Sequence, residues 1–215
     1  MMLAIETSGP VTSLVLWDGR VVGVESFESA QQLARRLVPA ISGLLSSRGL
    51  ALSDLTKVAV GLGPGSFTGL RIGVTTVRAL AHGLGLPLVG ISSLRVLAEQ
   101  AWTGAGPPDG ARVLAVARSK RGEVYAGCFG PGRELVEPFL LVQEEDLRAL
   151  VSGLPRPLVL AGRELLQVVD DLPLGHDGEV DDLPCLGHVV GQLLVAAAHR
   201  LGEGGLDAAE GVGEL

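Results

Sequence analysis

Hydrophobic and polar positions at the start of the chain predict three consecutive strands. Apolar runs flank a polar turn at 6–10, and a second turn, Asp18-Gly19, leads into a third apolar run at 21–27. Asp-Gly between two alternating runs is a strong signal for a tight hairpin. We therefore expect a three-strand meander over residues 2–27.

Helical spacing follows in residues 31–48, which contain Pro39. The apolar positions there lie three and four residues apart: Leu33, Ala34, Leu37, Val38, Ile41, Leu44 and Leu45. A buried strand is predicted at 57–62, then a glycine-rich turn and a helix that ends near residue 84. A short strand at 87–91 and a helix from Ser92 or Ser93 to about Trp102 complete this half.

The glycine-rich turn, GLGPGSFTG at 61–69, stands between a strand and a helix, which is where phosphate-binding loops occur. It does not match their fingerprints. In a G-x-G-x-x-G pattern its last position is Ser66 or Thr68, and it lacks the lysine of a P-loop. We expect a tight turn in which Ser66 caps the following helix.

The helix predicted at 67–84 has apolar or small residues on two sides. One stripe forms the expected core contact: Phe67, Leu70, Val74, Val77, Ala81 and Leu84. The adjoining side consists of Gly69, Ile72, Gly73, Thr76 and Leu80. Because each glycine costs about 1 kcal/mol of helix stability relative to alanine, close packing should compensate. Either the helix is enclosed within its own domain, or its glycine side docks onto a partner helix.

The second half of the chain repeats the order of the first. We predict strands at 114–116, 123–129 and 134–141, with a polar turn at 118–122 between the first two. A helix at 144–151 and a strand at 158–161 follow. The linker GAGPPDG at 104–110 separates the halves, so we predict lobes at 1–106 and 107–215. The helix predicted at 186–201 is expected to pack back on the first lobe. Duplicated lobes of a three-strand meander plus helices indicate an α/β, two-lobed, actin-like or sugar-kinase-like (ribonuclease H-like) fold.

Composition limits the cellular environment and the kinds of binding partner that we expect for this chain. Although 47% of the residues are hydrophobic, no run reaches the roughly 20 residues of a membrane helix, and the start of the chain predicts a cytoplasmic protein. A net charge of −7 argues against a chain that holds nucleic acid by itself. Cys128 and Cys185 are expected to be separate thiols.

In an actin-type fold the hairpin turns of both lobes face the cleft that holds a nucleotide. The first turn offers Glu6, Thr7 and Ser8 as degenerate binding candidates, whereas the second reads Arg118-Ser119-Lys120-Arg121. That basic turn is either solvated or in contact with a phosphate or an RNA backbone. No histidine pair at i, i+4 and no G-x-S-x-G elbow occurs in the sequence, so we predict no metal, cofactor or catalytic residue.

Three stretches together resemble the TsaB (YeaZ) family: LAIETS with SLVLWDG, the block at 61–94, and RGEVYAG at 121–127. The resemblance implies a non-catalytic scaffold that binds and supports a TsaD-type subunit, which transfers threonylcarbamoyl to adenosine 37 of tRNA. A TsaE-type ATPase joins the complex, and tRNA is contacted only indirectly. The implied partner surface lies on the first-lobe helices, at Gly69, Ile72, Gly73, Thr76, Leu80, Leu37, Ile41 and Leu44.

The sequence departs from this family at several positions. The family usually has Asp where Glu6 stands, a histidine near Gln31 or Gln32, Asp-Ala-Arg at 118–120, and a C-terminal Tyr-Leu-Arg segment that this chain lacks. The alternative function is an ATP-dependent small-molecule kinase of the same superfamily. We also expect the free chain to form a homodimer, because a bare apolar helix face favours self-association.

Overall fold

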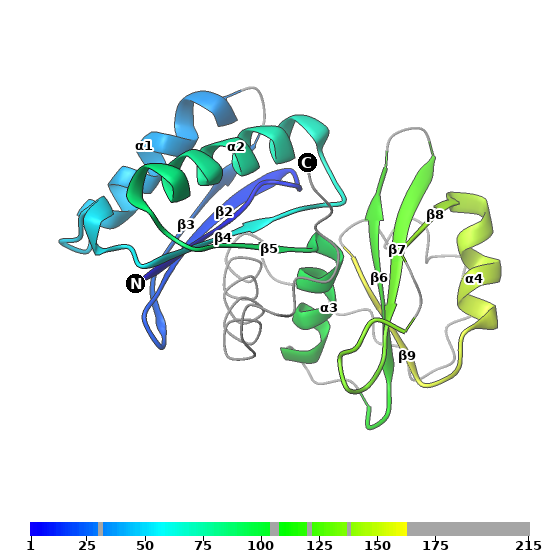
Figure 1. Cartoon of the computed structure of the whole chain (residues 1–215). Helices are drawn as coiled ribbons and strands as arrows, with labels where there is room; N and C mark the ends of the chain where they lie inside the picture. The colour runs from blue at the N-terminus through cyan, green and yellow to red at the C-terminus, as the bar shows by residue number, and fades with distance from the viewer. Residues whose placement is uncertain (30–31, 104–107, 120–121, 137–138, 163–215) are drawn as a thin grey trace.

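Two β-sheets, one from each half of the chain, form the framework of the molecule (Figure 1). The structure is a computed structural model that describes residues 1–29, 32–103, 108–119, 122–136 and 139–162. Each sheet contains three strands that pair antiparallel in chain order, and parallel strands then extend it, two in the first sheet and one in the second. The α/β, two-lobed fold with a duplicated meander is therefore confirmed.

The first sheet has the order β3-β2-β1-β4-β5. Its strands are β1 (Met2–Glu6), β2 (Val11–Trp17), β3 (Val21–Glu28), β4 (Lys57–Gly61) and β5 (Leu88–Ile91). β1 pairs antiparallel with β2, and β4 pairs parallel with both β1 and β5. β1 and β4 are almost wholly buried because neighbouring strands and helices cover them, which matches their continuous apolar sequence.

Two helices cover one face of this sheet, α1 (Leu33–Ser46) and α2 (Phe67–Leu84), with a short 3₁₀ turn, η1 (Leu52–Asp54), between them in sequence (Figure 1). Leu3 and Ile5 of β1 pack with Leu37 of α1 and Val77 of α2 in one hydrophobic cluster. The helical layer and the sheet therefore share a single core.

The second sheet has the order β8-β7-β6-β9 and carries one short helix on its outer face. Its elements are β6 (Arg112–Arg118), β7 (Glu123–Phe129), β8 (Leu140–Gln143), η2 (Glu144–Asp146), α4 (Leu147–Gly153) and β9 (Leu158–Ala161). Leu147 and Val151 of α4 pack on Leu114 and Val124 of the sheet.

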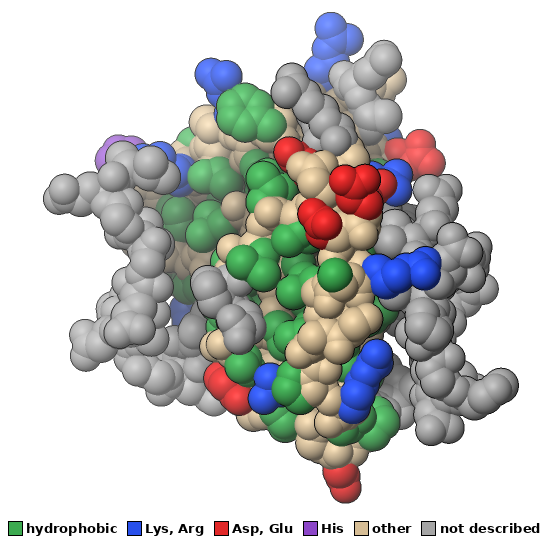
Figure 2. All heavy atoms as spheres, turned by 90° about the vertical axis from the view of Figure 1, so that its right-hand side faces the viewer, with side chains coloured by type: hydrophobic (Ala, Val, Ile, Leu, Met, Phe, Trp, Pro, Cys, Tyr) green, Lys and Arg blue, Asp and Glu red, His purple; other side chains and the backbone are tan. Residues whose placement is uncertain are grey.

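The third strand of this lobe was predicted at 134–141 and is wrong in its position. β8 begins at Leu140, and Leu135 makes only an isolated bridge with Phe129. Arg133 has a left-handed φ of 68°, and it closes a turn in which its N–H donates to the Gly130 carbonyl. The chain therefore reverses at 130–133, and residues 134–136 remain bonded to the end of β7 before β8 begins. Figure 2 faces this side of the molecule and shows hydrophobic side chains gathered in its middle.

Helix α3 (Ser93–Thr103) lies between the two sheets (Figure 1). Val96 packs with Ala4 and Val15 of the first sheet, whereas Leu94 and Ala98 belong to the hydrophobic cluster of the second sheet. The helix thus joins the two lobes, although its sequence precedes the predicted linker. The boundary at residue 106 stays a prediction. The helix predicted at 186–201 and Cys185 lie outside the described residues, and Cys128 is buried.

Candidate functional site

The glycines of α2 pack against the turn between β1 and β2. A Cβ atom at Gly69 would overlap the Thr7 backbone oxygen, and one at Gly73 would overlap the Thr7 hydroxyl. Ser66 accepts a hydrogen bond from the Gly69 N–H at 3.2 Å, which confirms it as the N-cap. The close approach that the glycines allow is therefore to a strand end of the same chain. Of the two alternatives for this side of the helix, the enclosed one holds for Gly69 and Gly73.

The buried stripe of α2 consequently differs from the predicted one. Gly69, Gly73, Val77 and Ala81 are buried, each four residues after the last. Phe67 is 70% exposed, so the prediction of a core role for it is wrong. It stands at the first helical position and borders the space between the two lobes. Leu84, in the last turn, is also exposed.

The residues predicted to contact a partner fall into two groups. Leu37, Ile41 and Leu44 are buried between α1 and the sheet, like the two glycines, so they support the helical layer and cannot themselves touch a partner in this conformation. The other three are only partly buried: Ile72, Thr76 and Leu80. The use of α1 and α2 as a partner surface stays a proposal, and it must rest on other side chains.

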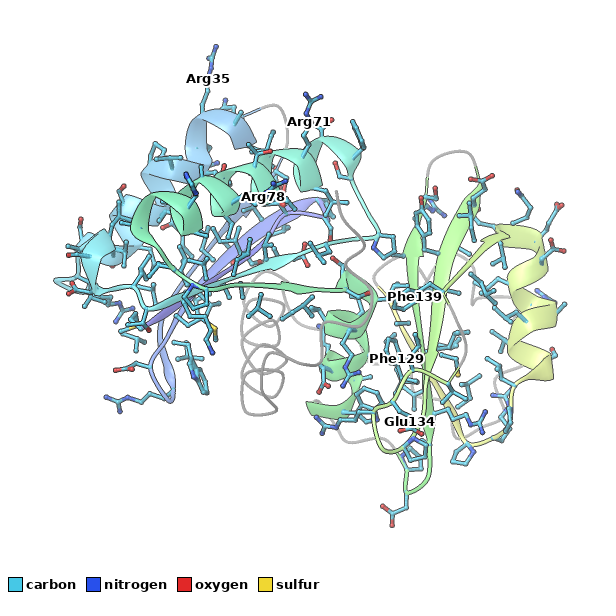
Figure 3. The ribbon with its side chains drawn as sticks, viewed as in Figure 1. Arg35, Arg71, Arg78, Phe129, Glu134 and Phe139 are labelled. Carbon is cyan, nitrogen blue, oxygen red and sulfur yellow. The ribbon has the colours of Figure 1, made fainter. Side chains whose placement is uncertain are left out.

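Exposed side chains of this layer come from both helices. Val38 of α1 is 55% exposed, and Phe67 begins α2. Arg35, Arg71 and Arg78 are exposed, and Figure 3 shows Arg35 and Arg71 projecting away from the sheet. We call the exposed surface formed by these five residues the helical face.

A cleft of about 950 Å³ separates the two lobes. One wall comes from the β1–β2 turn and the glycine-rich turn, the other from β6 and β7, and α3 contributes its first turns. Its polar and aromatic lining includes Glu6, Ser8, Ser13, Ser66, Ser93, Arg118, Ser119 and Tyr125. The structure therefore brings Glu6 and Ser8 to the cleft, as the fold predicts. Thr7 is instead fully buried against α2.

The Glu6 carboxylate is held by groups of its own lobe. The Ser8 N–H donates to Oε1 at 2.7 Å, and the Ser93 hydroxyl donates to Oε2 at 2.9 Å. The Ser93 oxygen in turn accepts from the Gly63 N–H at 3.1 Å. A Cβ at Gly61 would overlap the same carboxylate. Glu6 is 3% exposed, and its hydrogen bonds link the β1–β2 turn to the start of α3 and, through Ser93, to the glycine-rich turn. Its main role is therefore structural.

The sequence did not single out Ser93 or Gly61 as members of this network. Ser93 was predicted only as a helix cap, and it lies 87 residues from Glu6. Contacts at such separation leave no periodic signal in a single sequence. Gly61, the last residue of a buried strand, was the one local hint, because a glycine in a strand often marks a place where another group approaches the backbone closely.

Loss of the Ser93 hydroxyl should destabilise the chain. Ser93→Ala leaves the buried Glu6 Oε2 and the Gly63 N–H without their partner, which we expect to cost about 1–3 kcal/mol of unfolding free energy. Urea unfolding followed by circular dichroism measures it. Ser92→Ala is the matched control, because its hydroxyl has no hydrogen bond within the described residues. Equal unfolding midpoints for the two variants would contradict the network.

The basic turn of the second lobe is partly paired. The Arg118 Nε lies 2.9 Å from Oε1 of Glu144, and Arg118 lines the cleft. Lys120 and Arg121 lie outside the described residues, so the choice between a solvated turn and a phosphate contact stays open for them. Within the described lining of the cleft, the charged groups are Glu6 and Arg118.

The described residues contain no cluster of three or more His, Cys, Asp or Glu side chains that could ligate a metal ion. In the same residues, none of the helices has the length and apolarity that crossing a membrane requires. The cleft has the position of a ligand site, but its described carboxylate is already engaged by backbone and hydroxyl donors of the chain.

Comparison with known proteins agrees with the arrangement of the two lobes. A family model described as "TsaD: tRNA N6-adenosine threonylcarbamoyltransferase" matches residues 19–136. The chain is 37% identical to the "tRNA threonylcarbamoyladenosine biosynthesis protein TsaB" of Escherichia coli over 58% of this chain and 52% of that protein. It is 31% identical to the Bacillus subtilis protein of the same name, over 82% and 78%. The chain thus spans about half of the first relative and over three quarters of the second.

A solved structure titled "YeaZ from Pseudomonas aeruginosa" superposes with a TM-score of 0.73 and 29% identity, covering 94% of this chain and 93% of that one. Two lobes, each with a meander extended by parallel pairing, and this superposition place the chain among the α/β proteins of actin-like fold. Within that class, the chain belongs to the TsaB family.

Proposed function

We propose that this chain is the scaffold subunit of the bacterial complex that transfers a threonylcarbamoyl group to adenosine 37 of tRNA. In this role it binds and supports a TsaD-type catalytic subunit, and a TsaE-type ATPase joins the assembly. The relation to proteins named for tRNA threonylcarbamoyladenosine biosynthesis carries the proposal. The chain works in the cytoplasm and meets tRNA only through its partner.

The interlobe cleft supports a role without catalysis. The one carboxylate in its described lining accepts hydrogen bonds from Ser8 and Ser93, so it is not free to hold a metal–nucleotide complex. General acid–base or metal-assisted chemistry needs a side chain within reach of the reacting atoms. We therefore propose that the chain uses no cofactor and supplies no reacting group.

A direct binding measurement tests the scaffold role. The full-length chain, titrated into the TsaD-type subunit encoded in the same genome, should form a stable complex by calorimetry and by sedimentation. An absence of complex under all salt conditions would refute the proposal.

The second candidate function is a small-molecule kinase, because the cleft lies between the two lobes, where proteins of actin-type fold bind a nucleotide. Calorimetry of the isolated chain with ATP and magnesium separates the two. We expect no heat of binding at micromolar nucleotide, because the Glu6 carboxylate is already engaged. A micromolar dissociation constant would instead favour the kinase.

A further inference from the structure

Helix α3 is attached to the two lobes in unequal ways. Its residues contact three strands of the second sheet, β6, β7 and β9. Leu94 and Ala98 are buried in the hydrophobic cluster of that sheet, and Trp102 packs against the same cluster. Toward the first sheet, Val96 is the α3 residue in the shared hydrophobic cluster. The described packing of α3 is therefore mainly with the second lobe, although the helix follows β5 of the first lobe in sequence.

A buried ion cluster fastens α3 to the turn at 130–133 of the second lobe. Glu99 of α3 is 1% exposed, and its Oε2 accepts a hydrogen bond from Nη1 of Arg133 at 2.6 Å. Its Oε1 accepts from Nε of Arg95 at 3.2 Å. Because a buried carboxylate that loses a cationic partner is strongly destabilising, this pair resists any movement of α3 away from the turn. We call Glu99 and Arg133, together with the ring of Trp102, the clasp.

Aromatic rings extend the contact between α3 and the second sheet. The guanidinium carbon of Arg133 lies 5.3 Å from the ring centre of Trp102, and that of Arg95 lies 5.6 Å from the ring centre of Phe129. Both distances are within the roughly 6 Å over which a cation is attracted to an aromatic face. The rings of Trp102 and Phe129 meet edge to face, with their centres 6.2 Å apart. Phe129 is the last residue of β7 and is labelled in Figure 3.

The backbone of Arg133 indicates that its side chain has a purpose beyond the turn. Its φ is 68°, in the left-handed region that favours glycine, and no other non-glycine residue among those described has a positive φ. The Arg133 N–H donates to the Gly130 carbonyl at 2.8 Å, a bond that glycine would make equally well. The arginine is therefore explained by the contacts of its guanidinium with Glu99 and Trp102.

The first lobe holds α3 at its first residue. The Ser93 N–H donates to the Gly63 carbonyl at 2.7 Å. The Ser93 hydroxyl accepts from the Gly63 N–H and donates to Glu6. We call these three hydrogen bonds the latch. Because they all lie at the junction of β5 and α3, they fix the direction in which α3 leaves the first sheet, whereas the clasp fixes α3 on the second sheet.

We propose that α3 and the second sheet move as one rigid body against the first lobe, with residues 91–93 as the hinge. The clasp keeps α3 on the second sheet, and the latch sets the angle between the lobes and thereby the width of the cleft. The boundary between the moving parts then lies at the start of α3 rather than at residue 106. The hinge does not depend on the scaffold role, because it concerns contacts within the chain.

Arg133→Gly tests the clasp in the full-length chain. The variant removes the guanidinium and relieves the left-handed φ, so a residue that served only the turn would give a higher urea midpoint. The clasp instead predicts a lower midpoint, with the folding equilibrium constant reduced about tenfold or more. Arg148→Gly is unsuitable as a control because it would weaken α4. Arg148→Met and Arg133→Met form the matched pair, since Arg148 is exposed on α4.

Trp102 reports directly on the clasp. The sequence has two tryptophans, so a Trp17→Phe parent leaves Trp102 as the single emitter. Arg133→Met should shift its fluorescence emission, because the guanidinium no longer lies against the ring. Arg148→Met should leave the emission unchanged.

Spin labels on the two lobes test the latch. Ser42→Cys on α1 and Ala149→Cys on α4 are both exposed positions, and the parent chain carries Cys128→Ala and Cys185→Ala. The distribution of distances between the two labels is measured by double electron–electron resonance on the full-length chain.

Ser93→Ala should broaden this distribution and leave the emission of Trp102 unchanged, because α3 stays on the second sheet. Ser92→Ala is the matched control and should keep the original distribution, since its hydroxyl has no hydrogen bond within the described residues. If Ser93→Ala does not fold, Glu6→Gln gives the same measurement, because its amide group replaces one of the two acceptor oxygens of the carboxylate.

Three results would overturn the inference. A higher urea midpoint for Arg133→Gly, with unchanged Trp102 emission in Arg133→Met, would show that Arg133 serves only the turn. An unchanged label distribution in a folded latch variant would show that the latch does not set the angle between the lobes. A Trp102 emission that shifts as much in Ser93→Ala as in Arg133→Met would show that α3 does not move with the second sheet.

Discussion

Replacing Gly69 by valine should destabilise the first lobe by about 3 kcal/mol or more, enough to leave a marginal domain unfolded. A side chain at this position would overlap the Thr7 backbone oxygen, and a backbone atom cannot rotate away as the end of a flexible side chain can. Gly73→Val should act in the same direction through the Thr7 side chain. Urea unfolding of the full-length chain measures both effects.

Gly83→Ala provides the control for these two variants. It lies in the same helix, is exposed, and a Cβ there would meet nothing within 4 Å. Because alanine has the higher helix propensity, this variant should be neutral or more stable by about 0.5–1 kcal/mol. A Gly69→Val chain as stable as Gly83→Ala would show that α2 does not press on the β1–β2 turn.

The second large effect is expected at Leu37. This side chain is 1% exposed and packs in the core between α1 and the first sheet. Leu37→Ala removes buried methyl groups and leaves a cavity, so it should lower the unfolding free energy of the free chain by about 2–5 kcal/mol. Val38→Ala, the neighbouring and 55% exposed position, should change it by less than about 0.5 kcal/mol.

The same pair of variants separates core residues from docking residues. Val38→Ala should weaken binding to the partner without loss of stability, whereas any binding defect of Leu37→Ala should follow from unfolding. A stable Leu37→Ala chain with a large binding defect would return Leu37 to the partner surface on which the family resemblance placed it.

Local features of this fold were predictable because local sequence determines them. The hairpin β1–β2, the Asp18-Gly19 turn and the Ser66 cap each depend on residues within a few positions of one another. Helix α1 follows from its apolar spacing, and its buried residues include Leu37, Ile41 and Leu44. The duplication of the meander then indicated the two-lobed class.

The errors concern contacts between distant segments. The apolar count placed Phe67 in the core, but the buried side of α2 is the one with glycines, because it must approach Thr7. Large apolar residues are often buried, but many remain at the surface, so residue type alone does not decide which side of a helix faces the core. The position of β8 was missed because the residues after the turn at 130–133 make only an isolated bridge with the end of β7, which a single sequence does not reveal.

The candidate site was predictable only in part. The fold class placed Glu6 and Ser8 at the cleft, yet the hydrogen bonds that engage Glu6 reach Ser93 across 87 positions. The charge of the helical layer, in contrast, is present in the sequence itself as segments without Asp or Glu, and the net charge of −7 concealed it.

The scaffold role is tested most directly by reconstituted tRNA modification. A mixture of TsaD-type and TsaE-type subunits, threonylcarbamoyl adenylate and unmodified tRNA should form threonylcarbamoyladenosine only when this chain is added. In a control reaction without the TsaD-type and TsaE-type subunits, the chain with ATP and tRNA should form no threonylcarbamoyladenosine. Product formation at an unchanged rate when the chain is omitted would contradict the proposed role.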